Sequence, residues 1–128
     1  GQEATQSLDS QAASATAKGN AVAALRDYRK ALADDPTDPV ALTGEGWLLI
    51  QTEQKSLFQQ GMALLSAAEQ ADPIYEPAHL YRGTALLSAN DNADGVVELQ
   101  YYLSHGPDPS LVPRVEAAIA QAEKAEQG

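Results

Sequence analysis

The chain has 128 residues, a formal net charge of −10 and an isoelectric point near 4.4. Its eight lysines and arginines are scattered, and both nucleic acids and anionic membranes need clustered cations, so neither is favoured as a partner. The absence of cysteine excludes disulfides, thiolate catalysis and cysteine-bound metals, and it is compatible with any compartment. With 44% hydrophobic but only 5% aromatic residues, a core of alanine, leucine and valine favours an all-α fold.

The first third of the chain predicts two helices separated by a polar turn. The opening stretch GQEATQSL is polar and is expected to fray or to end a linker. An alanine-rich helix follows, and then the turn AKGN at 17–20. Leu25, Tyr28 and Leu32 form an apolar stripe at helical spacing. Proline lacks the amide that continues a helix, so Pro36 marks the end of the second helix.

The middle third repeats this arrangement around the turn QTEQK at 51–55. Asp38 and Pro39 supply an N-cap and a proline in the first turn of a helix. Ser56 to Gln59 has the form of a capping box that starts the next helix, which ends before Pro73. The stripes of the two helices are Leu42, Gly46 and Leu49, then Met62, Leu65 and Ala68.

The last third carries the pattern a third time and adds a terminal helix. Pro77 opens one segment, the turn ANDN at 89–92 follows, and Pro107 ends the next segment, 34 residues after Pro73. The stripes here are Leu80, Gly83 and Leu86 or Leu87, then Val96, Leu99 and Leu103. In the tail, one apolar face is opposed by a charged face, as in a capping helix; the apolar face holds Leu111, Val115, Ala118, Ile119 and Ala122.

This repeated pattern resembles the tetratricopeptide repeat, a 34-residue helix hairpin with the pattern W-x2-L-G-x2-Y, then A-x3-F, then P. The matching residues are His79, Arg82, Gly83, Leu86, Gly95, Leu99, Tyr102 and Pro107 in the third unit; Leu42, Glu45, Gly46, Leu49, Gly61, Leu65, Ala68 and Pro73 in the second; and Leu8, Gln11, Ala12, Ala15, Ala24, Tyr28, Ala31 and Pro36 in the first. The family's first aromatic residue is absent from all three units, and the second unit has three extra residues in its turn.

The resemblance implies an all-α, right-handed superhelical solenoid of three hairpins and a C-terminal capping helix, with seven helices in all. The expected repeats are about 5–38, 39–75 and 76–109, followed by a capping helix at about 110–126, in a single domain that spans 1–128. Small residues are expected where the helices of a hairpin cross, with larger residues between them. The small residues are Ala12, Gly46 and Gly83, opposed by Ala24, Gly61 and Gly95; the larger ones are Tyr28, Leu65 and Leu99.

In the family, the first helix of each unit lines a concave groove that binds partner peptides. Carried over residue by residue, this groove would use Val40, Thr43, Trp47 and Ile50 in the second unit; Pro77, Leu80, Thr84 and Leu87 in the third; and Gln6, Asp9 and Ala13 in the first. None of the eight residues from the second and third units is Lys, Asn or Arg, the residues with which family members clamp a peptide carboxylate. Carboxylate clamping of the chaperone-binding kind is therefore disfavoured.

Several short motifs are better explained by this repeat architecture than by a nucleotide-binding or metal-binding site. GEGWLL lacks the third glycine and the preceding strand of a dinucleotide-binding loop, although the register leaves Gly44 without a role. NDNADG has neither the first aspartate nor the final glutamate of a calcium loop, so a turn capped by Asp91 or Asn92 accounts for it better. No metal and no cofactor are predicted.

The titratable residues do not form a catalytic constellation in the sequence. ADDPTDP places Asp34, Asp35 and Asp38 in what is expected to be an exposed turn, where helix capping is their ordinary role. His79 and His105 fall on different helices without a second histidine or a cysteine nearby, so a structural or solvated role is expected for both. No nucleophile stands beside a base, and the chain is not predicted to be an enzyme.

The sequence therefore predicts a protein-interaction scaffold that binds an apolar or helical segment of another protein in its groove. A structural or oligomerisation module, such as a homodimer with a self-covered groove, is the alternative, since a lone Trp47 in an apolar helix is often core. The chain lacks an initiator Met, a signal peptide and an apolar run long enough for a membrane helix. The resemblance suggests a bacterial domain outside the cytoplasm, behind a membrane anchor that lies beyond this sequence; a cytoplasmic location is the alternative.

Overall fold

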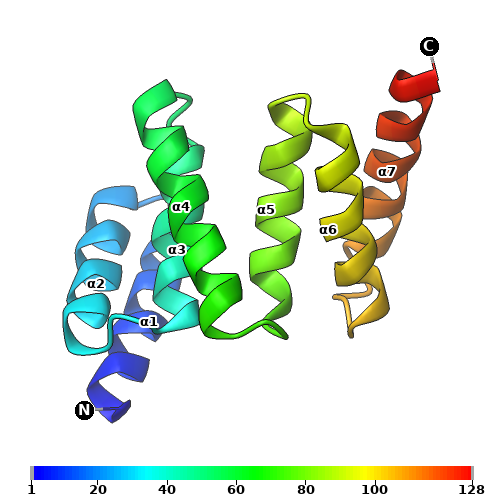
Figure 1. Cartoon of the computed structure of the whole chain (residues 1–128). Helices are drawn as coiled ribbons and strands as arrows, with labels where there is room; N and C mark the ends of the chain where they lie inside the picture. The colour runs from blue at the N-terminus through cyan, green and yellow to red at the C-terminus, as the bar shows by residue number, and fades with distance from the viewer. Residues whose placement is uncertain (1, 128) are drawn as a thin grey trace. The chain divides into compact units, whose positions relative to one another are not determined.

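The structure is a computed structural model that describes residues 2–127, and all of its regular elements in that range are α-helices (Figure 1). They are α1 (Gln2–Ala17), α2 (Ala21–Asp34), α3 (Pro39–Ile50), α4 (Lys55–Ala71), α5 (Glu76–Ser88), α6 (Asn92–Ser104) and α7 (Val112–Gln127). The prediction of an all-α chain with seven helices is confirmed for the described residues. None of these helices combines the length and the apolar character that a bilayer span requires.

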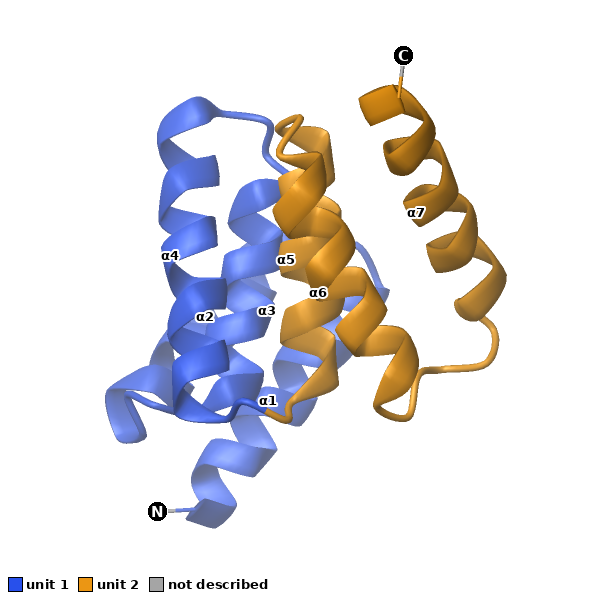
Figure 2. Cartoon of the chain, turned by 45° about the vertical axis from the view of Figure 1, so that its right-hand side comes forward, with its two compact units in different colours: residues 1–73 blue, residues 74–128 orange. Residues whose placement is uncertain are grey.

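The chain divides into two compact units, residues 1–73 and residues 74–128 (Figure 2). In the first unit, α1 packs on α2, α3 packs on α4, and α2 also contacts α3. In the second unit, α5 packs on α6, which contacts α7. The three helix pairs correspond to the three predicted hairpins.

The starts of α3 and α6 follow from the capping residues that the sequence predicts. Asp38 is the N-cap of α3 and accepts a hydrogen bond from the Val40 amide at 3.3 Å. Asp91 caps α6 in the same manner, because its carboxylate accepts from the Asp94 amide at 3.4 Å. After α1, Gly19 takes a left-handed conformation with φ +78°, which is the usual device for ending a helix.

The start of α4 differs from the prediction. The sequence predicts a capping box from Ser56 to Gln59, but α4 begins at Lys55, and its N-cap Gln54 makes no side-chain capping bond. The Thr52 hydroxyl instead accepts a hydrogen bond from the Gln54 amide at 3.3 Å. Ser56 therefore lies inside the first helical turn, and the capping-box prediction was wrong because the turn is organised earlier in the chain.

The core of the first unit is built around Tyr28, whose ring crosses from α2 to α3. A Cβ atom on Gly44 would lie 2.2 Å from Tyr28 Cζ, so only glycine leaves room for the ring. This contact explains Gly44, for which the repeat pattern gives no role. The remaining buried apolar residues around Tyr28 are small or aliphatic: Ala12, Ala24, Ala31, Ala41 and Leu48.

The two helices of the second hairpin approach most closely at a pair of glycines. A Cβ atom on Gly61 of α4 would lie 2.5 Å from the carbonyl oxygen of Gly46 on α3 and 2.8 Å from Ile50 Cγ1. Leu65 lies one turn further along α4 and is completely buried. The predicted crossing of α3 and α4 at these small residues is confirmed.

The second unit repeats this packing and then adds α7. A Cβ atom on Gly83 of α5 would lie 2.8 Å from Leu99 Cδ2, and one on Gly95 of α6 would lie 2.6 Å from Leu87 Cδ2. On α7, the buried residues are Val115, Ile119 and Ala122, which fall on the apolar face predicted for a capping helix.

The glycine crossing of α3 and α4 gives a stability prediction. Replacement of Gly61 by alanine forces a methyl group against backbone atoms of α3, so the hairpin must open. We expect Gly61→Ala to lower the free energy of unfolding of the first unit by about 1–3 kcal/mol. Urea unfolding followed by the fluorescence of Trp47, which lies on α3, measures this change.

The matched control is Gln60→Ala at the neighbouring exposed position of α4. It makes a comparable substitution to alanine away from α3 and is expected to change stability by no more than about 0.5 kcal/mol. Equal stabilities of the two variants would show that the glycine contact is not required for the close packing.

Candidate functional site

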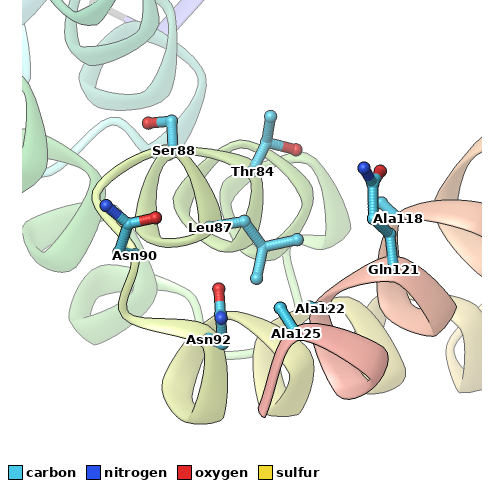
Figure 3. Close-up of a pocket in the computed structure, with 9 residues that line it drawn as sticks. All are labelled: Thr84, Leu87, Ser88, Asn90, Asn92, Ala118, Gln121, Ala122 and Ala125. Carbon is cyan, nitrogen blue, oxygen red and sulfur yellow. The ribbon is translucent and has the colours of Figure 1, made fainter. Parts of the chain in front are cut away.

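A cleft in the second unit is the candidate binding site (Figure 3). It has a volume of about 410 Å³, within the range of sites that hold small molecules or short peptide segments. Its walls come from the C-terminal half of α5, the turn into α6 and the C-terminal half of α7. The lining residues are Thr84, Leu87, Ser88, Asn90, Asn92, Ala118, Gln121, Ala122 and Ala125.

The helical register explains which residues face the cleft. Thr84, Leu87 and Ser88 are three or four residues apart and share one face of α5. On α7, Ala118, Gln121, Ala122 and Ala125 follow the same spacing. Asn90 has a left-handed backbone with φ +64°, which turns the chain sharply between α5 and α6. The cleft therefore depends on two helix faces and one tight turn.

The polar groups at the rim of the cleft are partly used by the protein itself. The Thr84 hydroxyl donates to the Leu80 carbonyl at 2.8 Å, and the Ser88 hydroxyl donates to the Ala85 carbonyl at 2.6 Å. The Asn92 amide donates to Glu126 Oε1 on α7 at 3.0 Å. The two hydroxyls thus keep lone pairs that can accept hydrogen bonds from a ligand.

None of the nine lining side chains carries a charge, and the floor is aliphatic. Leu87 is half-buried and Ala122 is buried, whereas Thr84, Asn90 and Gln121 are exposed. An apolar floor with amides and hydroxyls at its edge suits a neutral ligand with its own amide groups. A charged ligand would lose its hydration in this cleft without gaining a counter-ion.

The structure brings two of the predicted groove residues, Thr84 and Leu87, into this cleft. Leu80, also predicted for the groove, instead packs against the core that includes Leu99 and Tyr102. The repeat pattern did not indicate the contribution of α7. Ala118 and Ala122 were recognised only as part of an apolar face, and Ala125 and the exposed Gln121 have no distinguishing signal in the sequence.

The groove residues predicted on α3 differ among themselves in exposure. Thr43 is 2% exposed and Ile50 is 8% exposed, which leaves little of either side chain for a ligand to contact. Ile50 Cγ1 lies at the glycine crossing with α4. Val40 and Trp47 are both half-buried. A binding role for this face of α3 stays a prediction.

The groove residues predicted in the first unit also differ in their exposure to solvent. Gln6 and Ala13 are exposed on α1, as a groove assignment requires, but Asp9 is only 8% exposed. Asp38 is 7% exposed, so the expectation that the whole ADDPTDP segment is an exposed turn was wrong at this residue. Asp34 and Asp35 are exposed as expected. The buried side chains of Asp9 and Asp38 lie close together.

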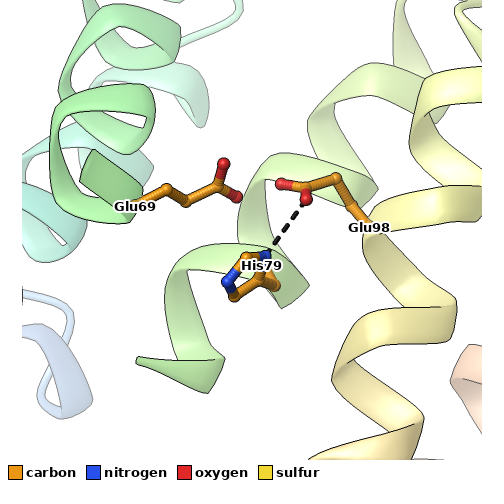
Figure 4. Close-up of side chains that lie close together, drawn as sticks. All are labelled: Glu69, His79 and Glu98. Carbon is orange, nitrogen blue, oxygen red and sulfur yellow. Dashed lines mark hydrogen bonds and ion pairs between the residues drawn. The ribbon is translucent and has the colours of Figure 1, made fainter. Parts of the chain in front are cut away.

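A buried polar cluster joins α5 to α6 in the second unit. His79 Nδ1 lies 3.1 Å from Glu98 Oε1, an interaction drawn in Figure 4. Arg82 Nη1 lies 3.4 Å from the other oxygen of the same carboxylate. The ring of Tyr101 is 4.0 Å from the His79 ring and 3.8 Å from the His105 ring. The two histidines, which the sequence places on separate helices, are thus connected through one tyrosine.

This cluster has a structural role at the crossing of α5 and α6, because its central carboxylate is only 9% exposed and holds two basic side chains. Glu98→Ala removes the buried carboxylate that contacts both the His79 ring and the Arg82 guanidinium group. We expect the variant to lower the free energy of unfolding of the second unit by about 3 kcal/mol. Chemical denaturation followed by circular dichroism is the measurement.

Glu116→Ala, at an exposed position of α7, serves as the charge-matched control and is expected to stay within about 0.5 kcal/mol of the parent. Glu98→Gln keeps a hydrogen-bonding group and should lose less stability than Glu98→Ala. If Glu98→Ala were as stable as Glu116→Ala, the cluster would have no structural role.

Comparison with solved structures identifies the fold. The first TPR domain of Spaghetti (RPAP3), solved with the HSP90 peptide SRMEEVD, has a TM-score of 0.85, 16% identity and 98% coverage of both chains. The chain has the tetratricopeptide-repeat fold. The TPR2B domain of yeast Sti1, solved in complex with pHsp70, has a TM-score of 0.80 and 14% identity, and the match covers 96% of this chain and 98% of that one.

The same tetratricopeptide-repeat fold occurs inside a larger enzyme. An O-GlcNAc transferase from Thermobaculum terrenum matches with a TM-score of 0.81 and 23% identity over 94% of this chain, but over only 22% of its own length. No protein-family model and no curated protein sequence matches the chain. The structural comparisons therefore establish the fold of this chain and do not establish its ligand.

Proposed function

We propose that this chain is a non-enzymatic protein-interaction module that binds a neutral, partly apolar segment of another protein in the cleft between α5 and α7. The observation that carries the proposal is the composition of the cleft, which combines an aliphatic floor with uncharged amide and hydroxyl groups. Two domains of the same fold were solved with chaperone peptides, which supports a peptide as the class of ligand.

The polar rim matches the groups that a peptide backbone presents. The amides of Asn90 and Gln121 offer both donors and acceptors, and the hydroxyls of Thr84 and Ser88 offer acceptors. A backbone amide that enters the cleft can exchange its water partners for these groups without leaving an unpaired polar atom. Leu87 gives an apolar side chain of the ligand a contact surface, so the segment gains hydrophobic burial as well.

The charge of the cleft separates this proposal from recognition of acidic chaperone peptides. The peptide SRMEEVD, bound by the Spaghetti domain, carries two glutamates and ends in an aspartate. Recognition of such a peptide favours lysine or arginine near its carboxylates. The nine residues of the cleft include neither, and the whole chain has a net charge of −10. A neutral segment is therefore the better match.

Selection from a random-peptide phage library on the full chain tests the proposal. We expect the selected peptides to be neutral and to carry apolar residues, and we expect SRMEEVD to bind at least about tenfold more weakly in calorimetry. Leu87→Asp places a charge on the cleft floor and should weaken the selected peptides by about tenfold or more. Blocking the C-terminal carboxylate of those peptides as an amide should leave their affinity unchanged.

Val97→Asp is the matched control, since Val97 is 64% exposed on α6 and does not line the cleft. It should bind the selected peptides as the parent does. Equal binding by the two aspartate variants would place the ligand elsewhere. Failure to select any peptide, together with a dimeric mass in light scattering that Leu87→Asp reduces to a monomer, would instead favour the assembly role.

A further inference from the structure

The first unit contains two aspartates that are buried against each other. Asp9 lies in the middle of α1, and Asp38 is the N-cap of α3. Asp9 Oδ1 and Asp38 Oδ2 are both inaccessible to water, and neither receives a hydrogen bond from an amide or hydroxyl donor. Buried carboxylate oxygens without donors are costly, so this arrangement needs an additional partner.

A proton shared by the two carboxyl groups supplies that partner. The Asp9 side chain lies within hydrogen-bonding reach of the Asp38 side chain, and two carboxyl groups can form a hydrogen bond only when one of them is protonated. Asp38 lies at the N-terminus of α3, and its Oδ1 already accepts a hydrogen bond from the Val40 amide. The proton is assigned to Asp9, because burial raises the pKa of that carboxyl group.

The surroundings of Asp9 are consistently unfavourable for its ionised form. Burial, together with the hydrogen bond and the negative charge of Asp38, raises the pKa of Asp9 to about 8. Asp35, which caps the end of α2, acts in the same direction. Thr5 lies one turn before Asp9 on α1, and its hydroxyl donates a hydrogen bond to Asp34 at the end of α2 at 2.6 Å. This hydrogen bond lowers the pKa of Asp34.

We propose that the proton shared by Asp9 and Asp38 is a latch that holds α1 on α2 and α3, and that α1 detaches as the pH rises from slightly acidic to slightly alkaline values. When the proton is lost, two buried carboxylates face each other with Asp35 nearby, and their repulsion acts directly between α1 and α3. A second polar contact of α1 in this region is the hydrogen bond from Thr5 to Asp34.

The direction of the pH effect follows from proton linkage. Asp9 binds its proton more tightly in the docked state than in an exposed helix, where its pKa returns towards 3.8. The protonated Asp9 therefore stabilises the docking of α1 fully below about pH 3.8. This stabilisation weakens as the pH rises from 3.8 towards 8 and is lost above about pH 8. Detachment uncovers the apolar residues that α1 covers on α2, including Ala24 and Tyr28.

Hydrogen exchange on the full chain between about pH 5.5 and 9 tests the latch. We expect the protection factors of α1 amides to fall by about tenfold per pH unit up to about pH 8, while those of α4 stay nearly constant. In Asp9→Asn the side-chain amide donates to Asp38 without titrating, so the protection of α1 should be independent of pH and higher than in the parent at pH 8. Asp38→Asn keeps the N-cap and removes the negative charge beside Asp9, so the pH dependence should weaken without disappearing, because Asp9 stays buried.

Asp35→Asn is the control, because it removes a negative charge from an exposed position of the same segment and should retain the pH dependence. The proposal is overturned if α1 protection in the parent is independent of pH, or if Asp9→Asn loses protection as the parent does. It is also overturned if millimolar Mg²⁺ or Ca²⁺ restores α1 protection at pH 8, because the pair would then hold a cation and not a proton.

Discussion

The close approach of the helices within each hairpin is the constraint on which the rest of the structure depends. Packed helices are ordinarily separated by roughly 8–10 Å, depending on the side chains between them. At Gly46 and Gly61, and again at Gly83 and Gly95, the positions where a Cβ would stand are already taken by the partner helix. In the α3–α4 hairpin the nearest atoms are backbone carbonyl oxygens, and in the α5–α6 hairpin they are side-chain atoms of Leu99 and Leu87.

This packing also positions the candidate cleft. Leu87 stands beside Gly95 at the crossing of α5 and α6, so its side chain is fixed at the base of the cleft by the same contact that closes the hairpin. Thr84 and Ser88 then follow from the helical register of α5. The second wall comes from α7, whose buried Val115 and Ile119 attach it to the unit and leave the adjacent face of the helix at the cleft.

The sequence predicts the helices well because the signals that define them are local. Pro36, Pro73 and Pro107 punctuate the repeats, and the apolar stripes have a helical period throughout. Gly46 and Gly61 could be assigned because they occupy matching repeat positions. Gly44 could not, since its role depends on where the Tyr28 ring of another helix lies. The error at Ser56 arose because a capping-box pattern is short and occurs by chance inside helices.

The candidate site was less predictable, because it depends on contacts between distant residues. Thr84 and Leu87, which the pattern predicts for a groove along the first helices of the repeats, line this cleft, but nothing in α7 distinguished Gln121 from other exposed residues. The contact of Asp9 with Asp38 joins two helices that are not neighbours in sequence, and the exposed appearance of ADDPTDP concealed it. His79 and Glu98 show the same limitation, since a buried hydrogen bond between two side chains leaves no periodic signal.

The uncharged cleft and the net negative charge of the whole molecule both disfavour acidic ligands. A chain with a net charge of −10 repels acidic ligands at a distance, and the cleft offers them no cation at close range. Similarity of fold to domains that were solved with chaperone peptides therefore does not carry their specificity to this chain. Selectivity here would rest on the exclusion of charged segments as much as on the apolar contact with Leu87.

The most direct test of this account is a nuclear magnetic resonance titration of the isotopically labelled chain with a neutral peptide selected for binding. The account predicts that the largest amide shifts fall on the cleft-facing residues of α5 and α7, with the side-chain amides of Asn90 and Gln121 shifting as well. Shifts confined to helices outside the cleft, such as α2 and α4, would contradict it.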